Sequence, residues 1–428
     1  MKKSLLEFDD TEMKALMLSM GQPAFRAKQI SEGLFSGRKL GEMSNIPADL
    51  KARLADGYTD IPIEIEKKFF SCDGTVKYLF RLWDGELIES VLMTYKYGKT
   101  LCISTQIGCR MRCAFCASGL DGLKRNLTAA EMLAQIIAVN RDGGGAETVE
   151  IRRGYSFENE NKSTRNSCGN PKYKDSENVG GYAFENIEKD TEKLNTRCKS
   201  AENVGGKVNG NAGNNTVSAK ENAYESSVKY SRVVTNVVLM GSGEPLDNYD
   251  NVCKFLKLAS APYALNIGGR NISLSTAGLA DKIRTIADCG FQFNLTVSLH
   301  APNDEIRSAI MPVNKKYNIA EVLSAARRYF ERTGRRLIFE YSLIKGVNDG
   351  RENAAELVRL LKGTPCHVNL IKLNRVEKTR LKGCGNTEAK EFLSVLTDGG
   401  ISATPRRIMG ADIEGACGQL KRRYGGIS

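Results

Sequence analysis

At 428 residues, 41% of them hydrophobic, the chain can bury a sizeable core and form one large or two to three ordinary domains. Its formal net charge of +12 favours a polyanionic partner, although a basic balance alone does not establish one. A run of about eighteen apolar residues occurs nowhere, which excludes a membrane-spanning helix, and the N-terminus lacks the apolar core of a signal peptide. We therefore expect a cytosolic protein.

Residues 1–95 are predicted to form a small N-terminal α+β domain. The predicted elements are three helices, Asp10–Ser19, Ala24–Phe35 and Pro47–Leu54, and a β-hairpin of Val76–Leu82 and Glu86–Met93. Its basic side chains include Lys14, Arg26, Lys28, Arg38, Lys39, Lys51 and Arg53. These charges fit either a solvated helical face or contact with a polyanion, and the charge pattern alone does not separate the two.

Residues 96–375 alternate between strand and helix patterns. The predicted strands are Thr100–Ser104, Val233–Met240, Ile272–Ser275, Phe291–Ser298, Leu337–Leu343 and His367–Ile371. The predicted helices are Ala129–Val139, Val252–Ala259, Ala280–Asp288, Ile319–Arg332, Ala354–Leu361 and Thr387–Leu396. Parallel strands need such crossovers, so an α/β class is expected. Six units predict an open, partial (β/α)6 barrel, followed by a C-terminal segment, 376–428.

Residues 143–231 interrupt the alternation. They are rich in Asn, Gly, Ser, Lys and Glu, and the motif Glu-Asn-Val-Gly-Gly occurs at 177–181 and again at 202–206. Such a composition buries too little apolar surface to offset the entropy lost on ordering. We expect a low-complexity, disordered insertion.

The strongest local signal is a loop with three cysteines directly after a predicted strand, Gly108-Cys109-Arg-Met-Arg-Cys113-Ala-Phe-Cys116. Three thiolates at this C-x3-C-x2-C spacing can ligate three irons of a [4Fe–4S] cluster and leave the fourth iron open. A structural zinc site usually needs a fourth Cys or His nearby, and none follows before Cys168. We predict Cys109, Cys113 and Cys116 as metal ligands, with a zinc or redox loop as the alternative.

Residues suited to holding a charged cofactor lie where the predicted strands end. They are Gly243 and Glu244 after the second strand, Ser275 at the third, Ser298, Leu299 and His300 at the fourth, and Asn374 after the sixth. The carboxyl ends of parallel strands share one edge, so these residues are predicted to line one pocket. Each has a structural alternative, such as an ordinary turn, a helix N-cap or a buried histidine.

The triplet and the strand-end residues together resemble the radical S-adenosylmethionine (SAM) superfamily. The resemblance implies that SAM chelates the open iron and that electron transfer cleaves it to a 5′-deoxyadenosyl radical. Cys102, on the first strand, and Cys417, in a small-residue loop near the C-terminus, have spacings that do not suit cluster ligands. Two spare thiols beside a radical source suggest covalent methyl carriage, because an adenine ring carbon is no nucleophile for ordinary alkylation.

Longer stretches are similar to the RlmN/Cfr family of RNA methyltransferases. They are Thr100–Cys109, Arg125–Leu127, Asn236–Gly241, Ser298–Asn303 and Ala416–Leu420, and the likeness covers nearly the whole chain apart from the insertion. Ser242, Lys372 and Gly415 depart from the usual family pattern.

The resemblance implies a mechanism in which one SAM methylates Cys417 and a radical from a second SAM removes a hydrogen from that methyl group. The methylene radical adds to an adenine carbon, and Cys102 attacks the Cys417 sulfur, forming a transient disulfide as the product leaves. Glu89 aligns with the family's proposed proton acceptor, with a strand-surface carboxylate as the alternative. Phe25-Arg-Ala-Lys-Gln29 is more similar to RlmN, which acts on C2 of adenine in 23S rRNA and tRNA.

The implied cofactors are a [4Fe–4S] cluster and two SAM molecules per turnover. The implied partners are 23S rRNA, tRNA and an electron donor such as flavodoxin or ferredoxin, with residues 1–95 as an RNA-binding accessory domain in a monomer. Three alternatives stay open: a Cfr-type methyltransferase acting on C8, a radical SAM enzyme that activates a protein or matures a cofactor, and a non-enzymatic RNA-binding protein with a cluster.

Overall fold

The computed structural model describes residues 2–143, 232–373 and 381–413. Residues 1–147 and 229–428 belong to one unit of the chain. The predicted insertion, Asn374 and Cys417 lie outside the described residues, apart from Gly143 at the start of the insertion.

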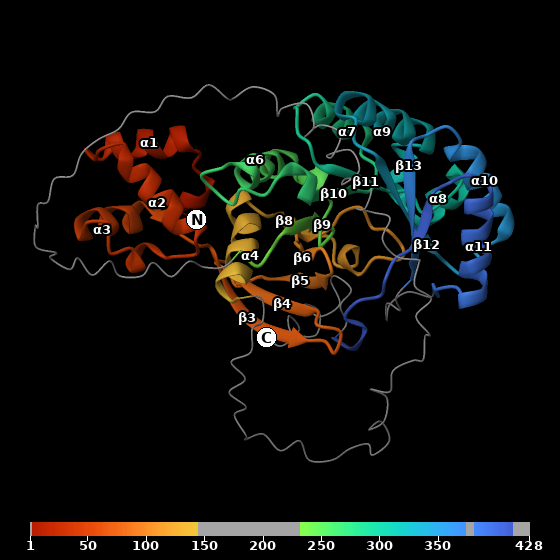
Figure 1. Cartoon of the computed structure of the whole chain (residues 1–428), viewed down its shortest axis with the longest axis horizontal. Coiled ribbons are helices and arrows are strands. Elements are labelled where there is room, and N and C mark those ends of the chain that lie inside the picture. Colours follow the sequence, from red (N-terminus) through yellow and green to blue (C-terminus); the bar gives the residue numbers. More distant parts are fainter. Residues whose placement is uncertain (1, 144–231, 374–380, 414–428) are drawn as a thin grey trace, which may run out of the picture. The chain divides into compact units, whose positions relative to one another are not determined.

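A ten-stranded mixed sheet organises the described part of the chain (Figure 1). Its strands are β3 (Ile63–Phe70), β4 (Val76–Leu82), β5 (Leu87–Tyr95), β6 (Gly98–Cys102), β9 (Asn236–Leu239), β10 (Ile272–Thr276), β11 (Asn294–Ser298), β12 (Leu337–Leu343), β13 (Cys366–Lys372) and β14 (Ala403–Pro405). The order across the sheet is β14-β13-β12-β11-β10-β9-β6-β5-β4-β3. Every pairing from β6 to β14 is parallel, whereas β3 to β6 pair antiparallel. The order is linear, with β14 and β3 at its two ends, which confirms the predicted open barrel.

Two short sheets lie beside the large one. They are β1 (Lys3–Ser4) with β2 (Tyr58–Thr59), and β7 (Gln106–Gly108) with β8 (Leu123–Asn126).

The helices follow the predicted alternation with shifted ends. They are α1 (Asp10–Ser19), α2 (Phe25–Phe35), α3 (Ala48–Gly57), α4 (Ala129–Arg141), α6 (Tyr249–Ser260), α7 (Ala280–Ala287), α8 (Asp304–Ile310), α9 (Ile319–Thr333), α10 (Arg351–Leu361) and α11 (Asn386–Asp398). Single 3-10 turns occur at Leu5–Glu7, Leu40–Glu42, Ala117–Gly119, Pro245–Asn248, Gly269–Asn271, Pro312–Lys315 and Ala411–Ile413. Within the described ranges, every helix is too short or too polar to cross a membrane.

Capping residues set several of these helix ends. Helix α4 begins with a capping box, in which the Thr128 hydroxyl accepts the Glu131 amide and the Glu131 carboxylate accepts the Thr128 amide. Helix α9 ends at Gly334, whose φ of 66° is the left-handed conformation that glycine adopts without strain.

The two faces of the parallel strands differ in chemistry because side chains alternate along each strand. Leu274 and Leu295 are buried in the apolar core. Ser273, Ser275 and Ser298 lie on the opposite face and are half-buried. We call this second face the inner face. A partly exposed, polar inner face leaves room for a ligand, which a fully packed barrel interior would not.

The hairpin of β4 and β5 is confirmed, but its placement in a separate unit ending at residue 95 is not. Strand β5 pairs with β6, so β3, β4 and β5 continue the core sheet. Without β5, one edge of β6 would expose unpaired amide and carbonyl groups, which this pairing satisfies. Strands β3 and β14 and helix α8 were not predicted from the sequence.

Arg307, on α8, joins the ends of two parallel strands from a fully buried position. Its guanidinium donates to the carbonyls of Ala277, Ser298, Leu299 and Tyr317 and to the Asn314 side chain. Burial lowers the pKa of Arg307 to about 10, so the group still carries its charge at neutral pH. Five acceptors therefore depend on one buried cation.

Replacing Arg307 with methionine should lower the free energy of unfolding by about 3–5 kcal/mol, because buried acceptors lose their donor. Urea unfolding followed by circular dichroism measures the change. Arg332→Ala is the control, since Arg332 is exposed and pairs with Asp288 on the surface. An unchanged unfolding midpoint for Arg307→Met would contradict this account.

Candidate active site at the carboxyl edge of the sheet

The three-cysteine loop is held between β7 and β8. At Gly108 (φ 80°), a Cβ atom would lie 1.9 Å from the Gly122 carbonyl oxygen, so only glycine fits. The Cys109 amide donates to that same carbonyl at 2.9 Å, and the Ala114 amide donates to the Ile310 carbonyl at 2.8 Å. The loop is thus fixed at its start and in its middle by backbone contacts.

The thiols of this loop affect one another electrostatically. Burial, together with the nearby Glu244 and Cys116, raises the pKa of Cys109 to about 12. Burial raises the pKa of Cys113 as well, and Cys116 and Cys109 add to the rise. Close thiols with raised pKa values need positive charge to become thiolates, and bound iron supplies it.

Among the described residues, no three metal-binding side chains converge on one point as a single ion requires. A [4Fe–4S] cluster instead takes one thiolate per iron, so its ligands stand apart. The loop borders a cavity of about 500 Å³ lined by Arg112, Cys113 and Ala114 and by Gly119–Gly122. Three mutually interacting thiols beside an open cavity fit this cluster.

The glycine turn after β9 packs tightly against the segment that follows β6. A Cβ atom at Gly241 would lie 2.4 Å from the Ile103 carbonyl oxygen, and one at Gly243 would lie 2.7 Å from the side chains of Thr105 and Gln106. The fully buried Gln106 accepts the Glu244 amide through Oε1 at 2.8 Å. Gln106 was not predicted as a site residue, because a glutamine on a strand is usually exposed.

Glu244 is buried at the junction of β9 and β10. Its carboxylate accepts the amide of Ala277 at 2.6 Å and that of Leu246 at 3.0 Å. Burial raises the pKa of Glu244 to about 7. The Thr276 side chain also hydrogen-bonds this carboxylate, so of its four lone-pair sites one is left for a cation such as the SAM ammonium.

His300 lies at the end of β11 with a φ of 56° and contacts the cysteine loop directly. The Phe115 ring packs edge-to-face on the imidazole, with centroids 4.7 Å apart. Burial, aided by Arg307, lowers the pKa of His300 to about 3, so the ring is neutral. Nδ1 accepts the Ser342 amide at 2.9 Å, which puts the single ring proton on Nε2 as a donor.

The other strand-end residues divide between the inner face and the core. Ser275 and Ser298 lie half-buried on the inner face. Leu299 has its side chain in the apolar core, so only its backbone can take part in binding. Buried oxygens without a protein partner among the described residues include Thr105 Oγ1 and Thr296 Oγ1, which fits a polar ligand at this edge.

Cys102 and Glu89 share the inner face. Val91 pairs with Cys102 across β5 and β6, and Glu89 is two residues from Val91 along β5. Diagonal neighbours of this kind have Cα atoms about 7–8 Å apart. Ser90, between them, points the other way and donates to Gln135 of α4 at 2.7 Å. Cys102 is 5% exposed and packs among Val91, Met93, Val238, Met240 and Met409.

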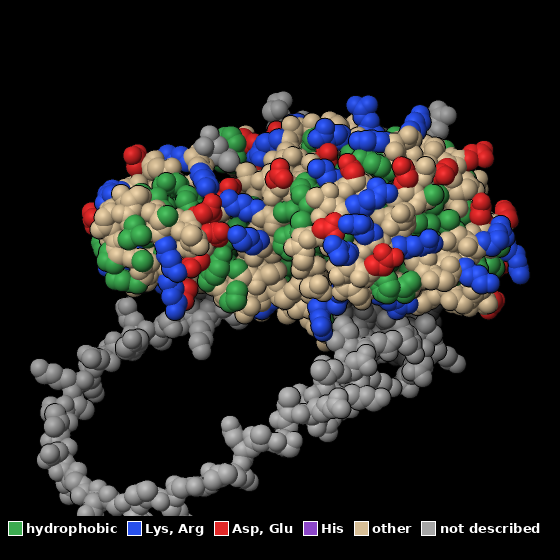
Figure 2. All heavy atoms as spheres, turned by 90° about the horizontal axis from the view of Figure 1, so that it is seen from above, with side chains coloured by type: hydrophobic (Ala, Val, Ile, Leu, Met, Phe, Trp, Pro, Cys, Tyr) green, Lys and Arg blue, Asp and Glu red, His purple; other side chains and the backbone are tan. Residues whose placement is uncertain are grey.

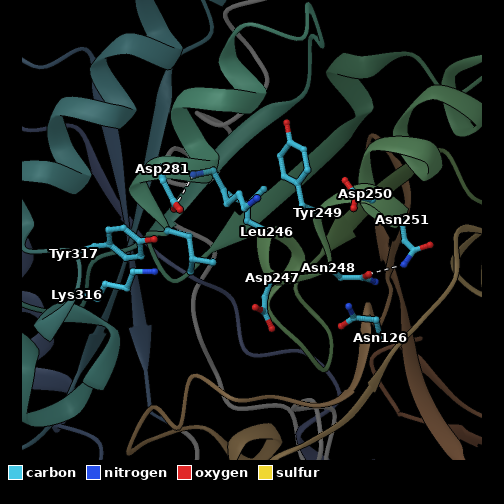
Figure 3. Close-up of a pocket in the computed structure, with 12 residues that line it drawn as sticks. Asn126, Leu246, Asp247, Asn248, Tyr249, Asp250, Asn251, Asp281, Lys316 and Tyr317 are labelled. Atoms are coloured by element: carbon cyan, nitrogen blue, oxygen red, sulfur yellow. Dashed lines mark hydrogen bonds between the residues drawn. The ribbon is translucent and has the colours of Figure 1, made fainter.

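A separate polar cavity of about 290 Å³ lies beside the glycine turn (Figure 3). It is lined by residues of the Pro245–Asn248 turn, including Asp247, and by Lys316 and Tyr317. Asp247 pairs with Arg110 of the cysteine loop at 2.7 Å. None of the described residues predicted to bind the cofactor lines this cavity, so it flanks the site without forming it.

Comparison with known proteins agrees with this geometry. The family model "Ribosomal RNA large subunit methyltransferase N-terminal domain" matches residues 3–59, and the Radical SAM superfamily model matches residues 216–358. A Clostridium novyi protein named "Probable dual-specificity RNA methyltransferase RlmN" is 39% identical over 99% of this chain and 98% of its own length. A Clostridium perfringens protein of the same name is 41% identical over 99% and 97%.

The chain belongs to the RlmN family. It is a radical SAM RNA methyltransferase, and the cofactors of this class are a [4Fe–4S] cluster and SAM. A crystal structure of a radical SAM methyltransferase from Sphaerobacter thermophilus matches it with a TM-score of 0.75 at 33% identity, covering 97% of this chain and 98% of that one.

In this RlmN-family protein, residues 406–413 form a strap that begins beside β14, at one end of the sheet order, and contacts the β3–β4 turn, at the other. The Arg406 amide donates to the Leu370 carbonyl at 2.7 Å. Met409 packs against the cluster of Val91, Met93 and Cys102, and the Gly410 amide donates to Asp73 at 2.7 Å. Asp412 accepts the Ser71 hydroxyl and the Cys72 amide. Cys417 follows four residues after Ile413, beyond the described part.

Removing the Asp412 carboxylate should loosen the strap without unfolding the sheet. Asp412→Ala deletes two charge-assisted hydrogen bonds, each contributing about 1 kcal/mol, so amides of 406–413 should exchange roughly five- to thirtyfold faster. Hydrogen–deuterium exchange with mass spectrometry measures this, with Asp398→Ala on α11 as the control. Unchanged exchange in 406–413 would contradict the contact.

Proposed function

We propose that this enzyme methylates C2 of a specific adenosine in 23S rRNA and in tRNA, with Cys417 as methyl carrier and Cys102 as resolving thiol. The observation that carries the proposal is the position of Cys102 on the inner face, in a cluster with Val91 and Met93 against which Met409 of the strap that leads to Cys417 packs. Cys417 is the fourth residue after Ile413, and a chain of this length reaches at most about 14 Å. The dual-specificity name of the Clostridium relatives supports the two RNA substrates.

In this proposal Cys109, Cys113 and Cys116 hold the cluster, and the groups at the strand ends hold SAM. Glu244 would receive the ammonium, while Gly243, Ser275, Ser298, the Leu299 backbone, His300 and Asn374 would contact the rest of the molecule. When bound, cluster and SAM supply a carbon radical able to remove hydrogen from a methyl group. Glu89 accepts the proton that leaves adenine C2, and Cys102 attacks the Cys417 sulfur to release the methylated base.

RNA recognition needs an unstacked base and contacts to phosphates. Exposed rings that can stack on bases are Phe25, Phe70, Trp83 and Tyr97. Lysine and arginine side chains are spread over the face seen in Figure 2 among acidic ones. In the N-terminal helices, Lys14 pairs with Asp10 and Lys28 with Glu32, which weakens the positive field there. Residues 1–95 are proposed as the accessory RNA-binding region, supported more by the exposed rings of Phe25, Phe70 and Trp83 than by excess charge.

The remaining partners follow from the reaction. Reductive cleavage of SAM requires one electron from a donor such as flavodoxin or ferredoxin. We propose that the protein is a monomer and lies in the cytosol. The reducing conditions of the cytosol keep Cys102 and Cys417 as thiols between turnovers.

Incubation of the anaerobically reconstituted enzyme with reductant, SAM and unmodified 23S rRNA or tRNA should give 2-methyladenosine, detected by mass spectrometry of digested nucleosides. Cys102→Ala and Cys417→Ala should each abolish the product. Cys366→Ala is the matched control, because Cys366 is 6% exposed, as buried as Cys102, but packs in the core. 8-Methyladenosine would assign the enzyme to C8 chemistry, and deoxyadenosine without a methylated nucleoside would exclude the RNA substrate.

Replacing any one cysteine of the loop should remove the cluster. Cys109→Ala, Cys113→Ala and Cys116→Ala should each lose the visible charge-transfer absorption and most bound iron, because three thiolates are needed for three irons. Iron analysis and absorption spectra of reconstituted protein measure this. Cys384→Ala, a buried cysteine elsewhere, should keep the full iron content. Retention of the cluster without Cys109 would contradict the assignment.

A further inference from the structure

A buried ion pair lies on the inner face next to Cys102. Lys77 Nζ of β4 is 2.9 Å from Glu89 Oε2 of β5, and their side chains are 0% and 2% exposed. The register places both on one face, since Lys77 pairs with Val91 and Leu79 pairs with Glu89. The pair is therefore a diagonal contact across two antiparallel strands, directed toward the site.

Several neighbours of this pair on the inner face are apolar. Val91, Met93, Met240 and Met409 pack around Cys102 on the same face. The other charged or titratable groups on or near this face among the described residues include Cys102 on β6, Tyr95 on β5, Asp73 in the β3–β4 turn, Arg406 on the strap, the exposed Lys67 on β3, which pairs with Leu79, and Arg81 paired with Glu66 at an exposed position. Within the described residues of this face, Lys77 Nζ is in ion-pair contact with the Glu89 carboxylate.

A purely structural role explains such a pair poorly. Removing two charges from water costs more than their attraction usually returns, and apolar side chains of similar size often stabilise a protein more. A carboxylate in apolar surroundings without a cation takes up a proton, because burial disfavours its charged form. A general base must be unprotonated before its substrate arrives. Lys77 meets that requirement for Glu89.

We propose that Lys77 is a positioning residue that keeps the Glu89 carboxylate ionised and oriented to accept the proton from adenine C2. The inference rests on the proposed function. In this step the C2–H bond breaks, its electron pair stays with the ring, and an O–H bond forms on Glu89. The buried Lys77 ammonium then faces a neutral acid, which favours loss of the proton to solvent and restores the carboxylate.

The test compares Lys77→Met, which removes the charge at similar length, with Lys77→Arg, which retains it. The full-length, cluster-reconstituted enzyme is given SAM, reductant and unmodified tRNA, and kcat for 2-methyladenosine is measured between about pH 6 and pH 9. Lys77→Met should be roughly ten- to hundredfold slower at neutral pH and recover as pH rises, because the carboxylate ionises only at higher pH. Lys77→Arg should keep the wild-type pH profile.

Two further measurements separate this role from simple loss of structure. Methylation of Cys417 in the protein, which needs no proton from adenine, should stay at the wild-type level in Lys77→Met, as read by peptide mass spectrometry. Lys68→Met is the matched control, because Lys68 pairs at 2.7 Å with Asp142, the C-cap of α4, on the opposite face of the sheet. It should leave rate and pH profile unchanged.

A wild-type rate and pH profile in Lys77→Met would overturn the proposal while leaving the methyltransferase reaction intact. Loss of Cys417 methylation in Lys77→Met and in a Lys77→Met/Glu89→Gln double variant would also overturn it, because the pair would then be structural. Absence of 2-methyladenosine from the wild-type enzyme would instead refute the proposed function itself.

Discussion

The register between β5, β6 and β9 determines which side chains meet at the site. Val91 pairs with Cys102, and Cys102 pairs with Val238, so these three residues share the inner face. A slip of one residue would turn Cys102 and Glu89 toward α4 and bring Ser90 inward. The contacts of Ser90 and Ser104 with Gln135 oppose such a slip from the other face. The positions of Cys102 and Glu89 thus follow from strand pairing.

Tight backbone contacts then bring three distant segments together at the carboxyl edge. The glycine turn after β9 approaches the 103–106 segment, and the cysteine loop packs on the end of α8 and on His300. The Arg307 guanidinium joins the ends of β10 and β11 by donating to the carbonyls of Ala277 and Ser298. These close approaches depend on glycine at the two turns and on one buried cation.

Much of this arrangement could be predicted from the sequence because the signals are local. Strand–helix alternation predicts the parallel sheet, and the strand-end rule predicts that Glu244, Ser275 and His300 share an edge. Lys77 could not be predicted, because in Lys77-Tyr-Leu-Phe-Arg81 it reads as an exposed strand residue. Its burial depends on the pairing of β4 with β3 and β5 inside the sheet. The pairing of β6 with β9 and the strap contacts at Asp73 join segments far apart in sequence, which no local pattern encodes.

The central claim is that the transferred methyl group passes through a methylene carried on Cys417. SAM labelled with three deuterium atoms on its methyl group tests this most directly, with mass spectrometry of the methyladenosine. The account predicts a product methyl with two deuterium atoms and one hydrogen, because one deuterium is abstracted on the enzyme and a solvent proton replaces it on release. A product that keeps all three deuterium atoms would mean direct methyl transfer and would contradict the account.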